Sequence, residues 1–81
     1  MSKVSSKELI SLQKALGKRI KFLRKQNEMS QLDLASLCDL EKTSISRIEN
    51  GRSNITLKTA LIIAKSLEVE LKDLFNLQLK E

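Results

Sequence analysis

The segment from residue 31 to residue 50, QLDLASLCDLEKTSISRIEN, limits the possible folds of this chain more than any other part of the sequence. Its apolar and small residues fall on one side of each of two short helices: Leu34, Ala35 and Cys38 on the first, Ile45 and Ile48 on the second. Both sides have to be buried, so the two helices must pack on each other across a short turn. The spacing therefore predicts a helix-turn-helix.

Two residues suit the point where these helices meet. Helices that cross steeply through a three- or four-residue turn approach closely at one place, and Ala35 supplies the small side chain needed there. Asp39 stands where the chain must reverse, which usually requires a positive φ. Glycine is the common residue at such a position, but aspartate is among the few others that tolerate it.

The segment resembles the helix-turn-helix of the phage-repressor and Cro-like (XRE-type) family of bacterial and phage regulators. The similarity extends from about Leu16 to Phe75, and its most specific part is SISRIENG, from Ser44 to Gly51. Asp39 departs from the family, which usually has glycine in the turn. The resemblance implies an all-α, compact five-helix, lambda-repressor-like domain that binds the major groove of double-stranded DNA.

The composition agrees with an all-α fold and a single domain. The 81 residues include no proline, two glycines and two aromatic residues, so Leu, Ile and Ala must build the core. We expect an N-terminal extension of the first helix over residues 1–15, the DNA-binding domain over 16–76 and a tail over 77–81.

Several classes of function find no support in the sequence. No apolar run approaches the roughly 20 residues that span a bilayer, and the N-terminus has no apolar signal core, so we expect a cytoplasmic protein. One cysteine and no histidine leave no zinc-finger spacing, and no phosphate loop or nucleophile–base set is present. We therefore expect no enzyme activity, cofactor, metal or small-molecule effector site.

The positive charge is concentrated at the N-terminal end. Residues 1–27 carry eight Lys or Arg and one acid, whereas residues 28–81 carry seven Lys or Arg and nine acids. Such an asymmetry can steer a protein toward a polyanion, although a solvated lysine-rich helix is equally compatible with it. Lys18 and Lys21 are weaker candidates for phosphate contacts.

The helix boundaries follow from capping residues. Ser5 and Glu8 have the form of a capping box, and apolar residues continue at helical spacing to about Lys25. Gly17 interrupts this pattern, so the alternative is a short N-terminal helix followed by the family's own first helix from about Leu16.

The later helices have comparable signals. Ser30 caps a helix over about 31–38, and Gly51 ends the recognition helix over about 42–50. Thr56 caps the fourth helix, and a last helix covers about 71–75. The residues of the fourth helix expected to face inward are Leu57, Ala60, Leu61, Ala64 and Leu67.

The recognition helix would present one hydrophilic face to DNA. Its expected base-contacting residues are Lys42, Thr43, Ser46 and Arg47. Similar family members imply a base or backbone contact for Ser44 and a phosphate contact for Gln31 at the start of the preceding helix. Arg52, Asn54 and Lys58 are further expected phosphate contacts.

The resemblance also implies an internal ion pair between Arg24 and Glu49. Glu49 lies on the partly inward side of the recognition helix, where an acid facing phosphates would be out of place without a partner. Arg24 follows the core position Leu23 and can supply a planar fork to hold that helix.

We expect a homodimer, because one recognition helix covers only a few base pairs. The expected dimer interface consists of Leu71, Leu74, Phe75, Leu77 and Leu79, with Leu9 or Ile10 as further contributors. The predicted function is a transcriptional regulator, most simply a repressor of a palindromic operator. The alternatives are an antitoxin with a toxin partner, a restriction-modification controller, or a protein-interaction module that has lost DNA binding.

Overall fold

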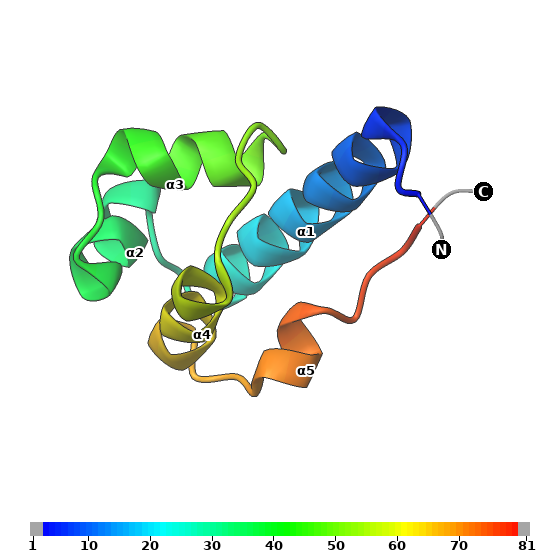
Figure 1. The fold of residues 1–81 in the computed structure, drawn as a ribbon. Helices are drawn as coiled ribbons and strands as arrows, with labels where there is room; N and C mark the ends of the chain where they lie inside the picture. Colours follow the sequence, from blue (N-terminus) through cyan, green and yellow to red (C-terminus); the bar gives the residue numbers. More distant parts are fainter. Residues whose placement is uncertain (1–2, 80–81) are drawn as a thin grey trace.

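The first helix, α1 (Ser6–Gln26), is the longest element of the computed structural model, which describes residues 3–79 (Figure 1). Ser5 caps it as predicted, since Ser5 Oγ accepts from the backbone N–H of Glu8 and the Glu8 carboxylate accepts from that of Ser5. The helix passes through Gly17 without a break, so the alternative of a separate N-terminal helix is wrong. Residues 1–2 of the predicted extension and 80–81 of the predicted tail lie outside the described residues.

The helices α2 (Gln31–Cys38) and α3 (Lys42–Glu49) form the predicted helix-turn-helix. Ser30 caps α2 through a hydrogen bond from the Asp33 N–H, and Asp33 accepts from the Ser30 N–H in return. Asp39 has the expected left-handed conformation, with φ of 56°. Ala35 is buried where the helices meet. The turn therefore works with aspartate in place of the family's glycine.

The fourth helix, α4 (Leu57–Ser66), is capped by Thr56 as predicted, but its buried side differs from the expected one. Ala60, Ala64 and Leu67 face the core, whereas Leu57 is 77% exposed and Leu61 45% exposed. Ile63, fully buried, completes the inward side instead. Leu61 consequently falls at its edge, and the prediction for Leu57 and Leu61 is wrong.

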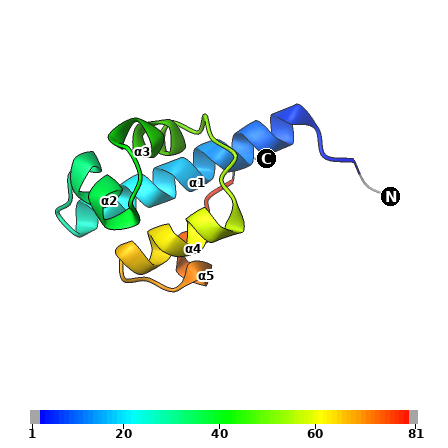
Figure 2. The same ribbon diagram turned by 60° about the vertical axis from the view of Figure 1, so that its left-hand side comes forward.

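One core joins all five helices of the described chain. Its fully buried large side chains come from every helix: Ile20, Leu34, Ile45, Ile63, Leu67 and Leu74. α1 packs against α3 and α5, α2 against α3 and α4, and α4 against α5, as the rotated view shows (Figure 2). Cys38 is a buried core residue, and burial raises the pKa of its thiol. No described helix is long and apolar enough to cross a membrane.

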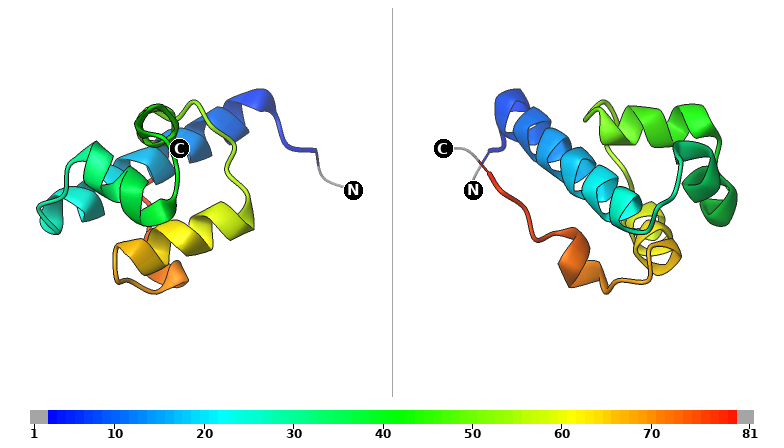
Figure 3. Two further views of the ribbon diagram at one scale, coloured as in Figure 1. Left: turned by 90° about the vertical axis from the view of Figure 1, so that its left-hand side faces the viewer. Right: turned by 180° about the vertical axis from the view of Figure 1, so that it is seen from behind.

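After α5 (Leu71–Leu74), the chain runs back along α1 toward the N-terminal end of that helix (Figures 1 and 3). Leu74 belongs to the core, so its assignment to a dimer interface is wrong: no part of it reaches the surface. Leu71 and Leu77 are partly buried against the core. Phe75 and Leu79 are 40% and 57% exposed, which leaves these two available for a partner.

Candidate nucleic-acid interface

The outer side of α3 is largely exposed to solvent. Ile45, Ile48 and Glu49 are buried on the inner side, whereas Lys42, Thr43 and Arg47 are exposed on the outer side. The view along α3 shows this helix end-on at the upper edge of the molecule, with α2 and α4 below it (Figure 3, left). A helix placed in this way can enter the major groove of DNA, which is wide enough to admit it.

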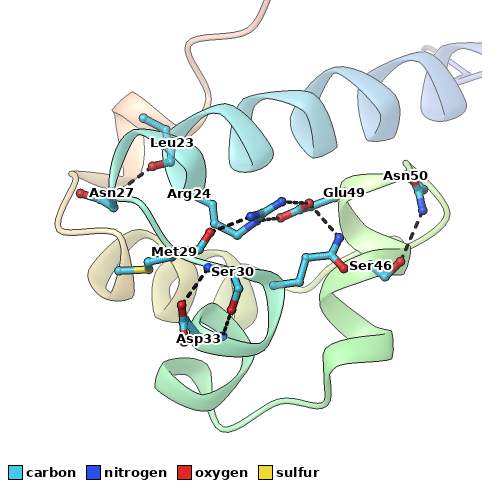
Figure 4. Close-up of polar contacts among 10 residues, drawn as sticks. Leu23, Arg24, Asn27, Met29, Ser30, Asp33, Ser46, Glu49 and Asn50 are labelled. Carbon is cyan, nitrogen blue, oxygen red and sulfur yellow. Dashed lines mark hydrogen bonds and ion pairs between the residues drawn. The ribbon is translucent and has the colours of Figure 1, made fainter.

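Ser46 is partly buried, unlike the three exposed residues of the same face. The Asn50 side-chain amide donates to Ser46 Oγ at 3.5 Å (Figure 4). The exposed Asn50 is thus a polar residue of this face that sequence reasoning missed. An asparagine immediately before the glycine that ends the helix was the available signal, since its amide offers donors and an acceptor at the helix end.

A shallow hollow of about 240 Å³ separates α3 from the start of α4. Ser44, Arg47 and Ile48 line it from α3, and Asn54 and Thr59 line it from the other side. The structure therefore places Ser44 and Asn54 beside Arg47. Arg52, in the following loop, and Lys58, in the first turn of α4, are both exposed. Basic and polar groups thus continue from α3 toward the N-terminus of α4.

Gln31 has a different environment from the one expected for a residue that contacts only phosphate. Its side-chain amide donates to Glu49 Oε1 at 3.1 Å, so it is tied to the inner side of α3. The backbone N–H groups at the start of α2 keep the orientation that suits an anion. The Asp33 carboxylate accepts from the Ser30 N–H at this end of α2, and hydrogen bonding with Ser30 holds the pKa of this carboxyl below its ordinary value.

Arg24 and Glu49 form the ion pair that the resemblance implied. Arg24 Nε donates to Glu49 Oε2 at 2.6 Å and Nη2 donates to Oε1 at 2.9 Å, which makes the contact bidentate (Figure 4). Arg24 Nη1 also donates to the Met29 carbonyl at 2.7 Å. The two side chains are 8% and 1% exposed. The hydrogen bond and charge of Glu49 raise the pKa of Arg24, so the guanidinium stays charged.

Two glycines allow α1 and the end of α3 to approach closely. A Cβ on Gly17 would lie 2.6 Å from the Glu49 carbonyl oxygen and closer still to that of Ile48. Gly51 has φ of 73°, and a Cβ there would lie 2.7 Å from Lys14 Cα. The end of α3 is therefore fixed on α1 by backbone contact as well as by the ion pair.

The structure shows no metal site among the residues that it describes. No group of three or more His, Cys, Asp or Glu side chains within residues 3–79 is arranged to hold a metal ion. Of the acidic groups in α2 and α3, Asp33 accepts a hydrogen bond from the Ser30 N–H and Glu49 pairs with Arg24.

Comparison with known proteins identifies relatives over most of this chain. The sequence model of the family described as helix-turn-helix (HTH_3) matches residues 20–74. The chain is 41% identical over 61 residues to control protein C.BamHI of Bacillus amyloliquefaciens, covering 74% of this chain and 75% of that protein. The crystal structure of the restriction-modification controller C.AhdI from Aeromonas hydrophila superposes with a TM-score of 0.74 at 30% identity, covering 85% of this chain and 98% of that one.

A third relative is considerably longer than this chain. Antitoxin PezA of Streptococcus pneumoniae is 36% identical over 59 residues, which are 73% of this chain and 37% of the antitoxin. The present chain thus corresponds to little more than a third of that protein's length. The resemblance first indicated by SISRIENG is confirmed by these matches.

Proposed function

Because the chain belongs to the helix-turn-helix family, we propose that it binds a palindromic operator as a homodimer and represses transcription there. The observation that carries this proposal is the division of α3 into two sides. Its inner side is fixed by Ile45, Ile48 and the buried Glu49, and its outer side presents Thr43 and Arg47 to solvent. Occupation of a promoter by such a protein is sufficient for repression.

The outer side of α3 suits direct contact with bases. Arg47 can donate two hydrogen bonds to the O6 and N7 atoms of one guanine, and Lys42 can reach the same acceptors. Thr43 can pack against a thymine methyl or donate its hydroxyl hydrogen, and Ser44 and Ser46 can contribute shorter-range polar contacts. Arg47 is the residue with the largest expected effect on specificity, since a bidentate contact distinguishes guanine from the other bases.

Phosphate contacts would fix the helix in register. Arg52, Asn54 and Lys58 extend from the end of α3 to the start of α4 and would meet the backbone on one side of the groove. The N-terminus of α2 would meet it on the other side. Here the role proposed for Gln31 is mainly that of positioning, because its side chain bonds Glu49 and orients the two helices.

A homodimer would place two copies of α3 about 34 Å apart on one face of the duplex. The exposed apolar residues at the end of the chain, Phe75 and Leu79, support this part of the proposal. Phe22 of α1 is 51% exposed and lines a hollow of about 690 Å³ together with Leu77 and Leu79. Such a group suits a second copy of this chain, since aromatic residues are enriched at protein interfaces.

Control of a restriction-modification system is the second candidate. It is favoured by the controllers among the relatives, which this chain matches over most of their length. An antitoxin role has weaker support, because the match covers 37% of PezA and leaves any toxin-binding part outside the comparison. Genes adjacent to this one would distinguish the roles: a restriction enzyme and methyltransferase for a controller, a toxin for an antitoxin.

The test of DNA recognition begins with selection of bound duplexes from a random pool. The selected operator should contain two related half-sites. Arg47→Ala should then weaken binding to it by about 1–3 kcal/mol and leave binding to random DNA nearly unchanged. Arg52→Ala is the matched control, because loss of a phosphate contact should weaken both kinds of DNA alike. Equal loss on both DNAs for Arg47→Ala would refute its role in base contact.

A further inference from the structure

Five lysines lie along one side of α1 and form what we term the lysine stripe: Lys7, Lys14, Lys18, Lys21 and Lys25. Their spacings of seven, four, three and four residues keep them within one sector of the helix surface. Lys7, Lys14 and Lys21 repeat at intervals of seven residues, so they follow almost a straight line along α1. The N-terminal half of this stripe was not among the expected DNA-contacting residues.

Two contacts of α1 fix the direction of the stripe relative to α3. Gly17 faces the carbonyl oxygens at the end of α3, and the Lys14 side chain packs beside Gly51, directly after that helix. Lys14 therefore lies next to the exposed Arg52 segment, a part of the chain already proposed to meet phosphates. Lys14 consequently borders the side of the molecule that carries Arg52, whereas Lys18, farther along the stripe, lines the hollow beside the apolar tail.

No ion pair within residues 3–79 neutralises the charges of the stripe. All five lysines are exposed. The ion pairs formed within residues 3–79 join Arg24 to Glu49 and Lys72 to Glu70, and neither involves the stripe. Glu8, the only acid of α1, accepts a hydrogen bond from the Ser5 N–H and follows Lys7 around the helix by about 100°. The stripe is thus a continuous positive edge.

The N-terminal half of α1 also extends past the end of α3, as Figure 1 shows on the side away from α2. Lys7 precedes Lys14 by seven residues, which corresponds to roughly 10 Å along the helix axis. One recognition helix covers only a few base pairs. A duplex lying along α3 would therefore have its flanking backbone beside Lys7 and Lys14, beyond the bases that α3 can reach.

We propose that Lys7 and Lys14 bind phosphates of the duplex outside the base pairs contacted by α3, and so lengthen the DNA footprint without adding sequence specificity. This inference rests on the proposed DNA-binding function. Lysine suits the role, because a flexible ammonium group can follow the backbone of any sequence. The partner is the phosphate backbone, and each contact should release counterions from the duplex.

The experiment compares the full chain with Lys7→Gln/Lys14→Gln and with the control Lys65→Gln/Lys72→Gln. The control removes the same charge from exposed positions in α4 and α5, outside the stripe. Binding to the selected operator is measured over a range of salt concentrations. One set of duplexes extends ten base pairs beyond each half-site, and the other ends at the last selected base.

For Lys7→Gln/Lys14→Gln on the long duplex, we expect the slope of log affinity against log salt to become shallower by about four, two for each protomer of the dimer. The control should keep the wild-type slope. On the short duplex the two variants should have equal slopes. A wild-type slope for Lys7→Gln/Lys14→Gln, or an equal fall in both variants, would overturn the proposal. Sequence preference and the effect of Arg47→Ala would then still stand, whereas failure of the wild-type chain to bind any DNA would refute the proposed function itself.

Discussion

α1 makes two junctions of very different kinds, one with the end of α3 and one with α5 and the chain that follows it. At the first, glycines permit backbone contact and a bidentate ion pair closes the gap. At the second, Arg19 Nε donates to the Asp73 carbonyl at 3.0 Å, and a hollow of about 690 Å³ remains between α1 and residues 76–79. The first junction is closely packed, and the second leaves apolar surface exposed.

This difference separates two requirements of a DNA-binding protein. The recognition helix has to keep one orientation, which close packing and a shielded ion pair provide because neither has an alternative arrangement nearby. The dimer that we propose requires apolar surface that stays exposed in the single chain, and Phe22 and Leu79 supply such surface. Mutations at the first junction should therefore lower the free energy of unfolding, and mutations at the second should change the oligomeric state.

The largest expected effect is the loss of one member of the buried ion pair. Glu49→Ala leaves the Arg24 guanidinium shielded from water without its partner, so we expect the free energy of unfolding to fall by about 3–5 kcal/mol. Urea denaturation monitored by circular dichroism measures this change.

The matched control removes both charges. Arg24→Met/Glu49→Leu should recover much of the lost stability, although the Met29 carbonyl also loses a donor in this variant. Additive losses below about 1 kcal/mol for each single change would show that the two charges are not coupled, and the α1–α3 junction would then depend on backbone packing alone.

Gly17→Ala tests the backbone contact at the same junction. The added Cβ would collide with carbonyl oxygens of α3, so we expect a loss of about 1–3 kcal/mol in the free energy of unfolding. This loss should appear even though alanine favours an isolated helix over glycine by about 1 kcal/mol. Ser11→Ala, at an exposed position of α1, is the control and should cause no loss. Equal or greater stability of Gly17→Ala would mean that the helices can separate freely.

The smallest effect on stability is expected at the open junction. Phe22→Ser/Leu79→Ser changes two side chains that are 51% and 57% exposed, so the monomer should lose only about 0.5 kcal/mol. Sedimentation at micromolar concentration should nevertheless shift from dimer to monomer. Leu57→Ser, at a residue 77% exposed on α4, should leave the dimer intact. A dimer that survives the double change would place the contact on another surface.

The features predicted correctly from the sequence depend mostly on neighbouring residues. Ser5 with Glu8 and Ser30 with Asp33 satisfy backbone groups three residues away, so the caps could be identified directly. Asp39 was recognisable because few residues tolerate a positive φ. These hydrogen bonds and backbone preferences depend on residues only a few positions apart, so they could be predicted without knowledge of how the helices pack.

The features missed depend on contacts between distant segments. Leu74 and Leu57 have the same side chain, but Leu74 is fully buried and Leu57 is 77% exposed. Their burial depends on how α4 and α5 dock. The hydrogen bond from Gln31 to Glu49 joins residues 18 positions apart and has no sequence signal of its own. Phe22 was overlooked because it lies outside the apolar spacing that defines the core side of α1.

The separation of the two sides of α3 has a consequence for how a protein of this kind can diversify. Thr43 and Arg47 are exposed, and the buried contacts that hold α3 in place come from other residues, so their replacement should leave the stability of the fold almost unchanged. Changes at these positions can therefore alter the preferred operator without a compensating mutation elsewhere. Descendants of one gene can acquire new targets through a few codons, while Ile45, Ile48 and Glu49 stay constrained by packing.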